Sequence, residues 1–207
     1  MRHLVVIGDI VSSKSIANRA RFQRQLASTL DALSGGNPSL VSPYTLTLGD
    51  EFQAVYGGAD GLFADLCRLK LACLPVRVRL SLAVGKISTA INPDQALGMD
   101  GPAFHTARAG IDALKASEGE FALAGPLPGD AATRDALIEL VCANLETWKP
   151  NRWAILAGLL AGASVSELAR ENRITEVAVY KNIRHARLDA LVPILKKQEL
   201  AIGKLLA

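Results

Sequence analysis

The chain has 207 residues, enough for one compact domain and a smaller second one, and half of its residues are hydrophobic. No apolar run approaches the roughly 18 to 20 residues that cross a bilayer, and Asp9 interrupts the first apolar stretch too early for a signal peptide. These features argue against a membrane or secreted protein and predict a soluble, cytoplasmic one. The cysteines, Cys67, Cys73 and Cys142, lack the spacing of a metal site, so we expect them to be reduced and buried.

The net charge of +3 is unevenly distributed along the chain. Residues 148–207 contain 10 Lys and Arg against 5 Asp and Glu, a net charge of +5, whereas residues 1–147 contain 13 against 15, a net charge of −2. A basic end of this kind is typical of a segment that contacts a polyanion. We therefore expect the C-terminal quarter of the chain to meet DNA.

The chain begins with a continuous apolar run that ends at Gly8-Asp9, which is the pattern of a buried central strand whose last residues reach a functional site. A short polar segment follows, Val11-Ser12-Ser13-Lys14, ahead of a helix predicted over residues 16–33. Backbone amides at a helix start, two hydroxyls and an ammonium are suited to a phosphate group. The alternative for Ser12 and Ser13 is simple capping of that helix.

Two alternating runs, residues 44–48 and 52–56, flank Gly49-Asp50 and predict a β-hairpin with an acidic tip. If the hairpin lies beside the first strand, Asp9 and Asp50 face each other. Two close carboxylates resist joint ionisation unless they hold a cation, and Mg²⁺ with substrate phosphates is the common case. The alternative is that Asp50 only serves the turn.

The elements that follow complete an α+β pattern. A helix is predicted over residues 61–71, a strand over 76–84, a loop over 91–100, a helix over 104–115, a strand over 121–124 and a connecting helix over 130–148. The order β-α-β-β-α-β at the start of the chain is typical of the split βαβ arrangement. We therefore expect a ferredoxin-like, palm-type domain with an antiparallel sheet and helices on one side of it.

Three helices are predicted after Lys149, over residues 152–160, 164–171 and 176–192, with a tight turn between the last two. This spacing is typical of a helix-turn-helix, in which small Ala169 lets two helices cross and Ile174 fills the turn. Six residues at the start and on the outward face of the third helix are the candidate DNA contacts: Thr175, Glu176, Val177, Tyr180, Lys181 and Arg184. The alternative is a trihelical module that docks onto a protein.

A last amphipathic helix is predicted over residues 194–207. One helix-turn-helix makes few base contacts, so specific binding requires two modules about one DNA turn apart. We therefore expect a homodimer, and this last helix is the segment that pairs the subunits.

Four blocks of the chain resemble, in order, the catalytic domain of class III nucleotidyl cyclases. They are Gly8-Asp9-Ile10-Val11, Gly49-Asp50-Glu51-Phe52, residues 77–85 and residues 101–108. Because a helix-turn-helix follows the cyclase-like part, the chain is identified as a member of the SatD family. The resemblance implies three parts: a nucleotidyl cyclase-like palm domain over residues 1–128, a connecting helix over 129–148 and a DNA-binding domain over 149–207.

The resemblance also implies roles for individual residues. Asp9 and Asp50 correspond to the aspartates that bind Mg²⁺ or Mn²⁺, with the backbone of Ile10, and Glu51 is either a further ligand or an exposed turn carboxylate. The lysine that selects the base falls on Leu46, and the asparagine and arginine that support the transition state fall on His105 and Ala109. His105 and Arg108 are therefore the candidate catalytic residues in this chain.

Two functions of different class follow from these residues. In the first, the front domain binds a nucleotide with Mg²⁺, and its occupancy adjusts DNA binding by the attached module, which makes the protein a transcription regulator. In the second, the front domain is an active nucleotidyl cyclase or nucleotide hydrolase, and the tail localises or dimerises it. The altered cyclase residues favour the first.

Overall fold

The computed structural model describes residues 1–47, 49–145 and 147–207, and these ranges form a five-stranded sheet and eight α-helices, so the fold is α+β as predicted. Leu48 of the predicted hairpin and Glu146 of the predicted connecting helix lie outside the described residues. The strands are β1 (His3–Ile10), β2 (Leu40–Leu46), β3 (Glu51–Tyr56), β4 (Val78–Gly85) and β5 (Phe121–Ala124).

The sheet has the order β2-β3-β1-β4-β5, with β1 at its centre. The pairs β1–β3, β1–β4 and β2–β3 are antiparallel, but β5 pairs parallel to β4, so the sheet is mixed and not wholly antiparallel as predicted. Because β1 is bonded on both sides, a residue at its end lies between β3 and β4. This placement puts Asp9 within reach of side chains from several elements.

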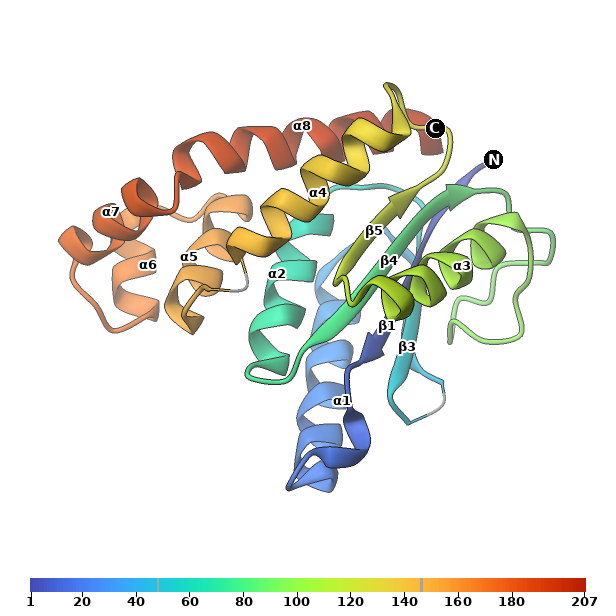
Figure 1. Ribbon diagram of the computed structural model, residues 1–207, viewed down its shortest axis with the longest axis horizontal. Coiled ribbons are helices and arrows are strands. Elements are labelled where there is room, and N and C mark those ends of the chain that lie inside the picture. Colours follow the sequence, from blue (N-terminus) through green and yellow to red (C-terminus); the bar gives the residue numbers. More distant parts are fainter. Residues whose placement is uncertain (48, 146) are drawn as a thin grey trace.

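Helices cover both faces of the sheet, whereas they were predicted on one face only, and they extend beyond the sheet (Figure 1). They are α1 (Arg19–Gly36), α2 (Leu62–Cys73), α3 (Pro102–Ser117), α4 (Ala131–Leu145), α5 (Pro150–Leu160), α6 (Val165–Glu171), α7 (Glu176–His185) and α8 (Leu188–Leu206). Helices α1 and α2 pack on one face, whereas α3 packs on the other. In the described ranges, no helix combines the length and the apolar character that crossing a membrane requires.

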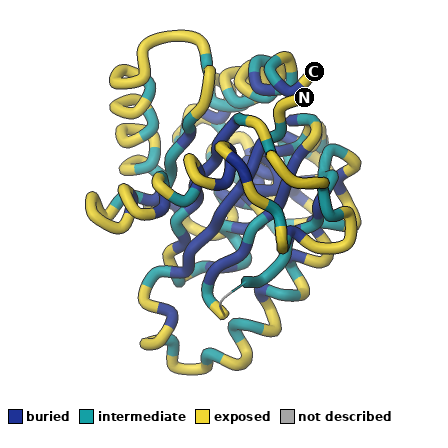
Figure 2. Tube along the Cα trace, turned by 90° about the vertical axis from the view of Figure 1, so that its right-hand side faces the viewer, coloured by how far each residue is buried: buried dark blue, intermediate teal, exposed yellow. Residues whose placement is uncertain are grey.

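The alternation of side chains along β1 serves two cores, because successive residues of a strand point to opposite faces. Val5 and Ile7 pack with the buried residues of α3, while Leu4 and Val6 belong to the core under α1 and α2. Figure 2 shows that the deeply buried residues are concentrated in the strands. The larger core is continuous with the C-terminal helices, so these helices are packed onto the sheet domain.

The first helix begins three residues later than predicted. Ser13–Ser15 forms a single 3-10 turn after β1, and α1 begins only at Arg19. Neither Ser12 nor Ser13 caps α1. The cap is Asn18, whose side chain accepts a hydrogen bond from the Arg21 N–H at 3.1 Å.

The third helix of the C-terminal module is shorter than predicted. It ends at His185 instead of residue 192, and Pro193 lies inside the following helix, α8. Arg187 adopts a left-handed conformation with φ 53°, which turns the chain. This turn carries Leu188 into the core, where it is fully buried, and such burial outweighs the small gain from one uninterrupted helix.

The cysteines only partly follow the expectation. Cys67 and Cys73 are buried in α2, and burial raises the pKa of each thiol to about 12, so both are unreactive. Cys142 on α4 is only partly buried. All three are free thiols.

Candidate functional site

Asp9 lies at the end of β1, directly opposite Glu51 on β3 and Arg79 on β4. Its side chain is only 9% exposed. Arg79 Nη1 donates to Asp9 Oδ2 at 3.0 Å, and Lys115 Nζ, from α3, lies 3.0 Å from Asp9 Oδ1. Both carboxylate oxygens of Asp9 therefore have a cationic partner within the protein.

Glu51 completes the same cluster from the neighbouring strand. Arg108 Nη1 donates to Glu51 Oε2 at 2.7 Å, and Lys115 Nζ lies 3.5 Å from Glu51 Oε1. Arg108 and Lys115 are seven residues apart on α3, which places them two turns apart on one helix face. Lys115 thus bridges two carboxylates on adjacent strands, and Glu51 is a buried strand residue, not the exposed turn carboxylate of the alternative expectation.

The charge state of Lys115 follows from this position. Partial burial opposes the ammonium form, but the hydrogen bonds and charges of Asp9 and Glu51 outweigh it and raise the pKa of Lys115 above its usual value. The lysine is therefore fully charged at neutral pH. The carboxylates of Asp9 and Glu51 are thus paired with three cations, Arg79, Arg108 and Lys115.

The predicted partner of Asp9 is offset by one residue. Asp50 lies beside β1, where its carbonyl oxygen accepts a hydrogen bond from the Ile10 N–H at 2.9 Å, but the residue directly opposite Asp9 is Glu51. The Asp50 carboxylate instead accepts a hydrogen bond from Ser13 Oγ at 2.6 Å. Among the described residues, no three His, Cys, Asp or Glu side chains are grouped so as to hold a metal ion.

The proposed phosphate segment lies between β1 and the 3-10 turn. The Val11 N–H donates to the carbonyl of Arg77 at 3.0 Å, and Ser12 adopts a left-handed conformation with φ 53°. Ser13 is buried against Asp50, while Lys14 is exposed. Because α1 begins further along the chain, the amides of this segment are not the N-terminus of a long helix.

The two candidate catalytic residues have different surroundings. Arg108 belongs to the charged cluster through Glu51. His105 is exposed near the N-terminus of α3, and its Nε2 lies 2.7 Å from Asp100 Oδ1. The structure therefore brings Arg108, but not His105, into contact with the acidic pair.

Arg79 and Lys115 are the residues of this cluster that sequence reasoning did not single out. A signal for Arg79 was its place on the polar side of an alternating strand. The signal for Lys115 was its spacing of seven residues from Arg108 in a predicted helix. Neither signal identifies the carboxylate that each side chain meets.

The C-terminal module is built around α6 and α7. Ser164 and Glu167 form a reciprocal capping box at the start of α6, and Thr175 Oγ1 accepts a hydrogen bond from the Ala178 N–H at the start of α7 at 3.2 Å. Between the helices, the Ile174 N–H donates to the carbonyl of Ala169 at 3.0 Å. The turn is thus fixed by backbone hydrogen bonds and by both caps.

Gly158 allows α5 to approach α6 closely. A Cβ at this position would lie 2.2 Å from Leu168 Cδ2, so any larger residue would collide with the buried leucine. On α7, Val179 is completely buried, whereas Val177 is 63% and Tyr180 55% exposed. All six candidate DNA contacts are exposed to solvent: Thr175, Glu176, Val177, Tyr180, Lys181 and Arg184.

These features define an α+β protein with a charged cluster at the end of its central strand and a packed group of C-terminal helices. The chain belongs to the SatD family, whose family model matches residues 3–184. No curated protein matches the chain. A solved structure, that of a regulator of polyketide synthase expression from Bifidobacterium adolescentis, is similar at 16% identity over 98% of this chain and 80% of that chain, with a TM-score of 0.27.

Proposed function

We propose that this protein is a cytoplasmic, DNA-binding transcription regulator. The observation that carries the proposal is the arrangement of α6, the four-residue turn and α7, in which one side of α7 is buried at Val179 and the other presents Tyr180 and Lys181 to solvent. A helix-turn-helix reads DNA with such an exposed second helix, and its N-terminal residues meet base edges. We expect Thr175, the cap residue at the start of α7, to contact a phosphate.

The charge of the module supports DNA as its partner. Residues 148–207 have a net charge of +5, and Lys181 and Arg184 lie on the exposed side of α7. Phosphate contacts supply much of the affinity of DNA-binding proteins, and tyrosine adds stacking or hydrogen bonding at base edges. A protein-docking module would not require these cations.

Contacts between the helices of the sheet domain and those that support α7, the proposed DNA-contacting helix, can transmit a change in packing from one to the other. Helix α5 packs against α2 and α8, and the Phe63 N–H at the start of α2 donates to Glu199 Oε1 of α8 at 2.9 Å. A ligand that changes the packing of α2 therefore acts on helices that support α7. Such coupling requires different ligand affinities for two states of the protein.

The test is DNA binding by a variant that lacks two charges of α7. Lys181→Ala together with Arg184→Ala should weaken binding to random-sequence duplex DNA and reduce the slope of log K against log salt by about 2. Lys196→Ala together with Lys197→Ala removes the same net charge from exposed positions on α8 and should leave most of the affinity intact. Equal losses of DNA affinity in the two double variants would show that α7 is not the helix that contacts DNA.

A second candidate function is nucleotide binding at the end of β1, with Mg²⁺ or Mn²⁺ as cofactor. It is favoured by the strand order β4-β1-β3-β2 of the first four strands, which fits the palm-type domain, and by the adjacency of Asp50 to β1. Val11 and Ser12 also line a hollow of about 660 Å³ beside Arg21 and Arg77. This hollow has the size of a ligand site.

Lys115 bridges Asp9 and Glu51, so a divalent ion bound by Asp9 would have to displace its ammonium. We propose that Asp9 and Asp50 hold the cation only in a state in which Lys115 has moved away. Thermal stabilisation by each nucleoside triphosphate with Mg²⁺, measured in the wild type and in Asp9→Asn and Asp50→Asn, tests this function. Product formation in the same samples, lost in both variants, would favour the enzyme instead.

Homodimer formation is proposed through α8. Leu188, Ile202 and Leu206 pack into the core of their own chain, which leaves Ile194 and Leu200 as the exposed apolar residues of this helix. Light scattering on the wild type and on Leu200→Glu tests the proposal. A monomeric wild type would contradict it.

A further inference from the structure

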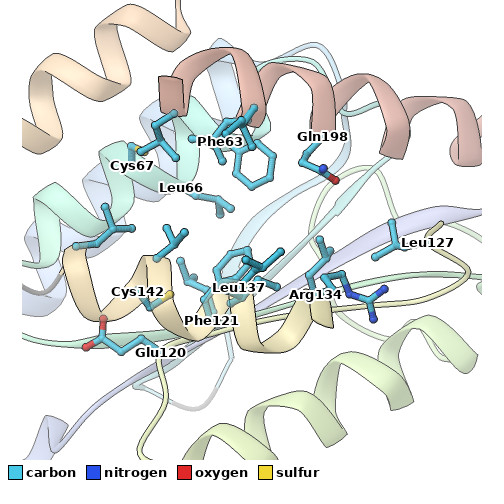
Figure 3. A pocket seen from close by; sticks show the side chains of 18 of the residues that line it. Phe63, Leu66, Cys67, Glu120, Phe121, Leu127, Arg134, Leu137, Cys142 and Gln198 are labelled. Carbon is cyan, nitrogen blue, oxygen red and sulfur yellow. The ribbon is translucent and has the colours of Figure 1, made fainter. Parts of the chain in front are cut away.

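A cavity of about 500 Å³ lies between the sheet domain and the C-terminal helices (Figure 3). Its walls come from α2, β5, α4, α5 and α8, and most of its lining is apolar, including Phe63, Leu66, Phe121, Leu137, Trp153 and Leu195. Ligand sites in proteins have this size, are mostly apolar and occur where two units of a protein meet. The cavity is distinct from the charged cluster at the end of β1.

Helix α4 forms one wall of the cavity and buries little of its surface against the rest of the protein. No described residue of α4 is fully buried. Val141 faces the cavity and is still 39% exposed, and Leu140, which does not line it, is 69% exposed. An apolar helix with so little burial gains stability when a further apolar body fills the space beneath it.

Arg134 on α4 supplies an unsatisfied donor at the cavity. Its Nε is buried and has no hydrogen-bond partner among the described residues, and Asp135 Oδ1 lies 3.7 Å away, beyond hydrogen-bonding distance. Glu120, which also lines the cavity, is paired with both Lys70 and Arg77, so its charge is already compensated. A buried donor without an acceptor is destabilising, and an anionic or carbonyl acceptor on a ligand would remove this penalty.

We propose that this cavity binds an amphipathic monoanion, with a hydrocarbon body under α4 and a carboxylate on Arg134. The apolar walls select the hydrocarbon, and the guanidinium selects a planar carboxylate, which it can engage through two hydrogen bonds. Medium-chain fatty acids belong to this chemical class. Gln198 of α8 also lines the cavity and adds a neutral polar group.

A ligand in this position touches both halves of the molecule. Phe63 and Phe121 belong to the sheet domain, whereas Trp153 and Leu195 belong to helices that support α7. Filling the cavity therefore changes the support of the proposed DNA reader. This consequence rests on the proposed regulatory function, but the binding site itself does not.

Intrinsic fluorescence measures binding directly, because the chain has two tryptophans and both are near the cavity. Trp153 lines the cavity, and the ring of Trp148 lies 5.5 Å from that of Trp153. Decanoate, titrated below its micellar concentration, should change the emission saturably. Arg134→Gln should weaken decanoate binding about tenfold, the equivalent of one charge-assisted hydrogen bond, and should leave decanol binding unchanged.

Two neighbouring positions on α4 provide a matched pair of variants. Val141→Phe fills part of the cavity and should abolish saturable binding, whereas Leu140→Phe adds the same ring at an exposed position and should not. Saturable binding that depends on Arg134 and Val141 supports the site. Absence of saturable binding in the wild type, or equal affinity in all variants, overturns it.

Two measurements separate the two proposals: decanoate binding by the wild type, and DNA binding by Lys181→Ala with Arg184→Ala. If decanoate binds and Lys181→Ala with Arg184→Ala has no effect on DNA binding, the cavity proposal stands and the DNA-reading proposal fails. If DNA binding requires those residues but decanoate does not bind, only the cavity proposal fails.

Discussion

The ammonium of Lys115 lies 3.0 Å from a carboxylate oxygen of Asp9, on the side of that carboxylate away from the oxygen bound by Arg79. The same ammonium lies 3.5 Å from Glu51. Two carboxylates on adjacent strands repel each other unless a cation lies between them. In this protein α3 supplies a cation in this position, the ammonium of Lys115.

Removal of the Lys115 charge should make the acidic pair available to a metal ion. We expect Lys115→Met to bind Mn²⁺ at least about tenfold more tightly than the wild type, because the ammonium no longer competes with the metal ion for the carboxylates. A tenfold change corresponds to about 1.4 kcal/mol of binding free energy. Electron paramagnetic resonance of free Mn²⁺ in a titration measures this affinity. Adding Asp9→Asn to the variant should reverse the gain.

The matched control for this prediction is Lys204→Met, which removes the same charge from an exposed position on α8. It should leave Mn²⁺ affinity unchanged. Equal affinities for the wild type and Lys115→Met would mean that Lys115 does not compete with a cation.

The apolar patterns were sufficient to predict the strands and the adjacency of the first strand and the hairpin, but not the parallel pairing of β5 with β4. The runs ending at Asp9 and beginning near Phe52 both became neighbouring strands. The register between β1 and β3, which places Glu51 instead of Asp50 opposite Asp9, could not be predicted from the sequence. It is set by how the hairpin is hydrogen-bonded to β1. Sequence patterns give side-chain direction, but pairing between distant strands gives register.

The contacts of Arg79 and Lys115 with Asp9 could not be predicted from the sequence for a related reason. Arg79 and Lys115 are 70 and 106 residues from Asp9 in the sequence, and they meet it only when β4 pairs with β1 and α3 packs on the sheet. No local pattern marks such a contact. The start of α7 and the bounds of α6 were easier to predict, because the cap and the apolar residues of each helix are separated by only a few residues of one segment.

Gly8 is required by packing, because Phe52 fills the space that a side chain at position 8 would occupy. A Cβ at this position would lie 2.0 Å from the Cζ atom of Phe52, which is completely buried. We therefore expect Gly8→Ala to destabilise the protein by about 1 to 3 kcal/mol through overpacking. Urea unfolding followed by circular dichroism measures the change.

Gly35 offers the control for this substitution. A Cβ there meets no atom within 4 Å, and the residue lies in α1. Gly35→Ala should be neutral or should stabilise by up to about 1 kcal/mol, because alanine loses less backbone entropy in a helix. A loss of stability at Gly35 as large as that at Gly8 would contradict the packing argument.

The ion pairs of Glu120 should make stability depend on acid pH. Burial opposes ionisation, but Lys70 and Arg77 outweigh it and hold the pKa of Glu120 below its usual value of 4.5. A depressed pKa contributes stability that is fully present above pH 4.5 and is lost as the pH falls through the folded value. The difference in unfolding free energy between the wild type and Glu120→Gln should therefore be largest at neutral pH and shrink below pH 4.5. A difference that grows in acid would contradict this assignment.

Thr175 and Tyr180 should separate the folding of α7 from its contact with DNA. Thr175 Oγ1 caps the helix by accepting from the Ala178 N–H, so Thr175→Ala should cost about 1 kcal/mol of stability. Tyr180 is 55% exposed and is not part of the buried core, so Tyr180→Ala should leave stability unchanged within about 0.5 kcal/mol. For DNA affinity we expect the opposite ranking, with the larger loss for Tyr180→Ala. Fluorescence anisotropy with a duplex at low salt measures this loss, and the thermal unfolding of Tyr180→Ala should stay that of the wild type. If Tyr180→Ala retained full affinity, Tyr180 would have no role in DNA binding, and any contact by α7 would depend on Lys181 and Arg184.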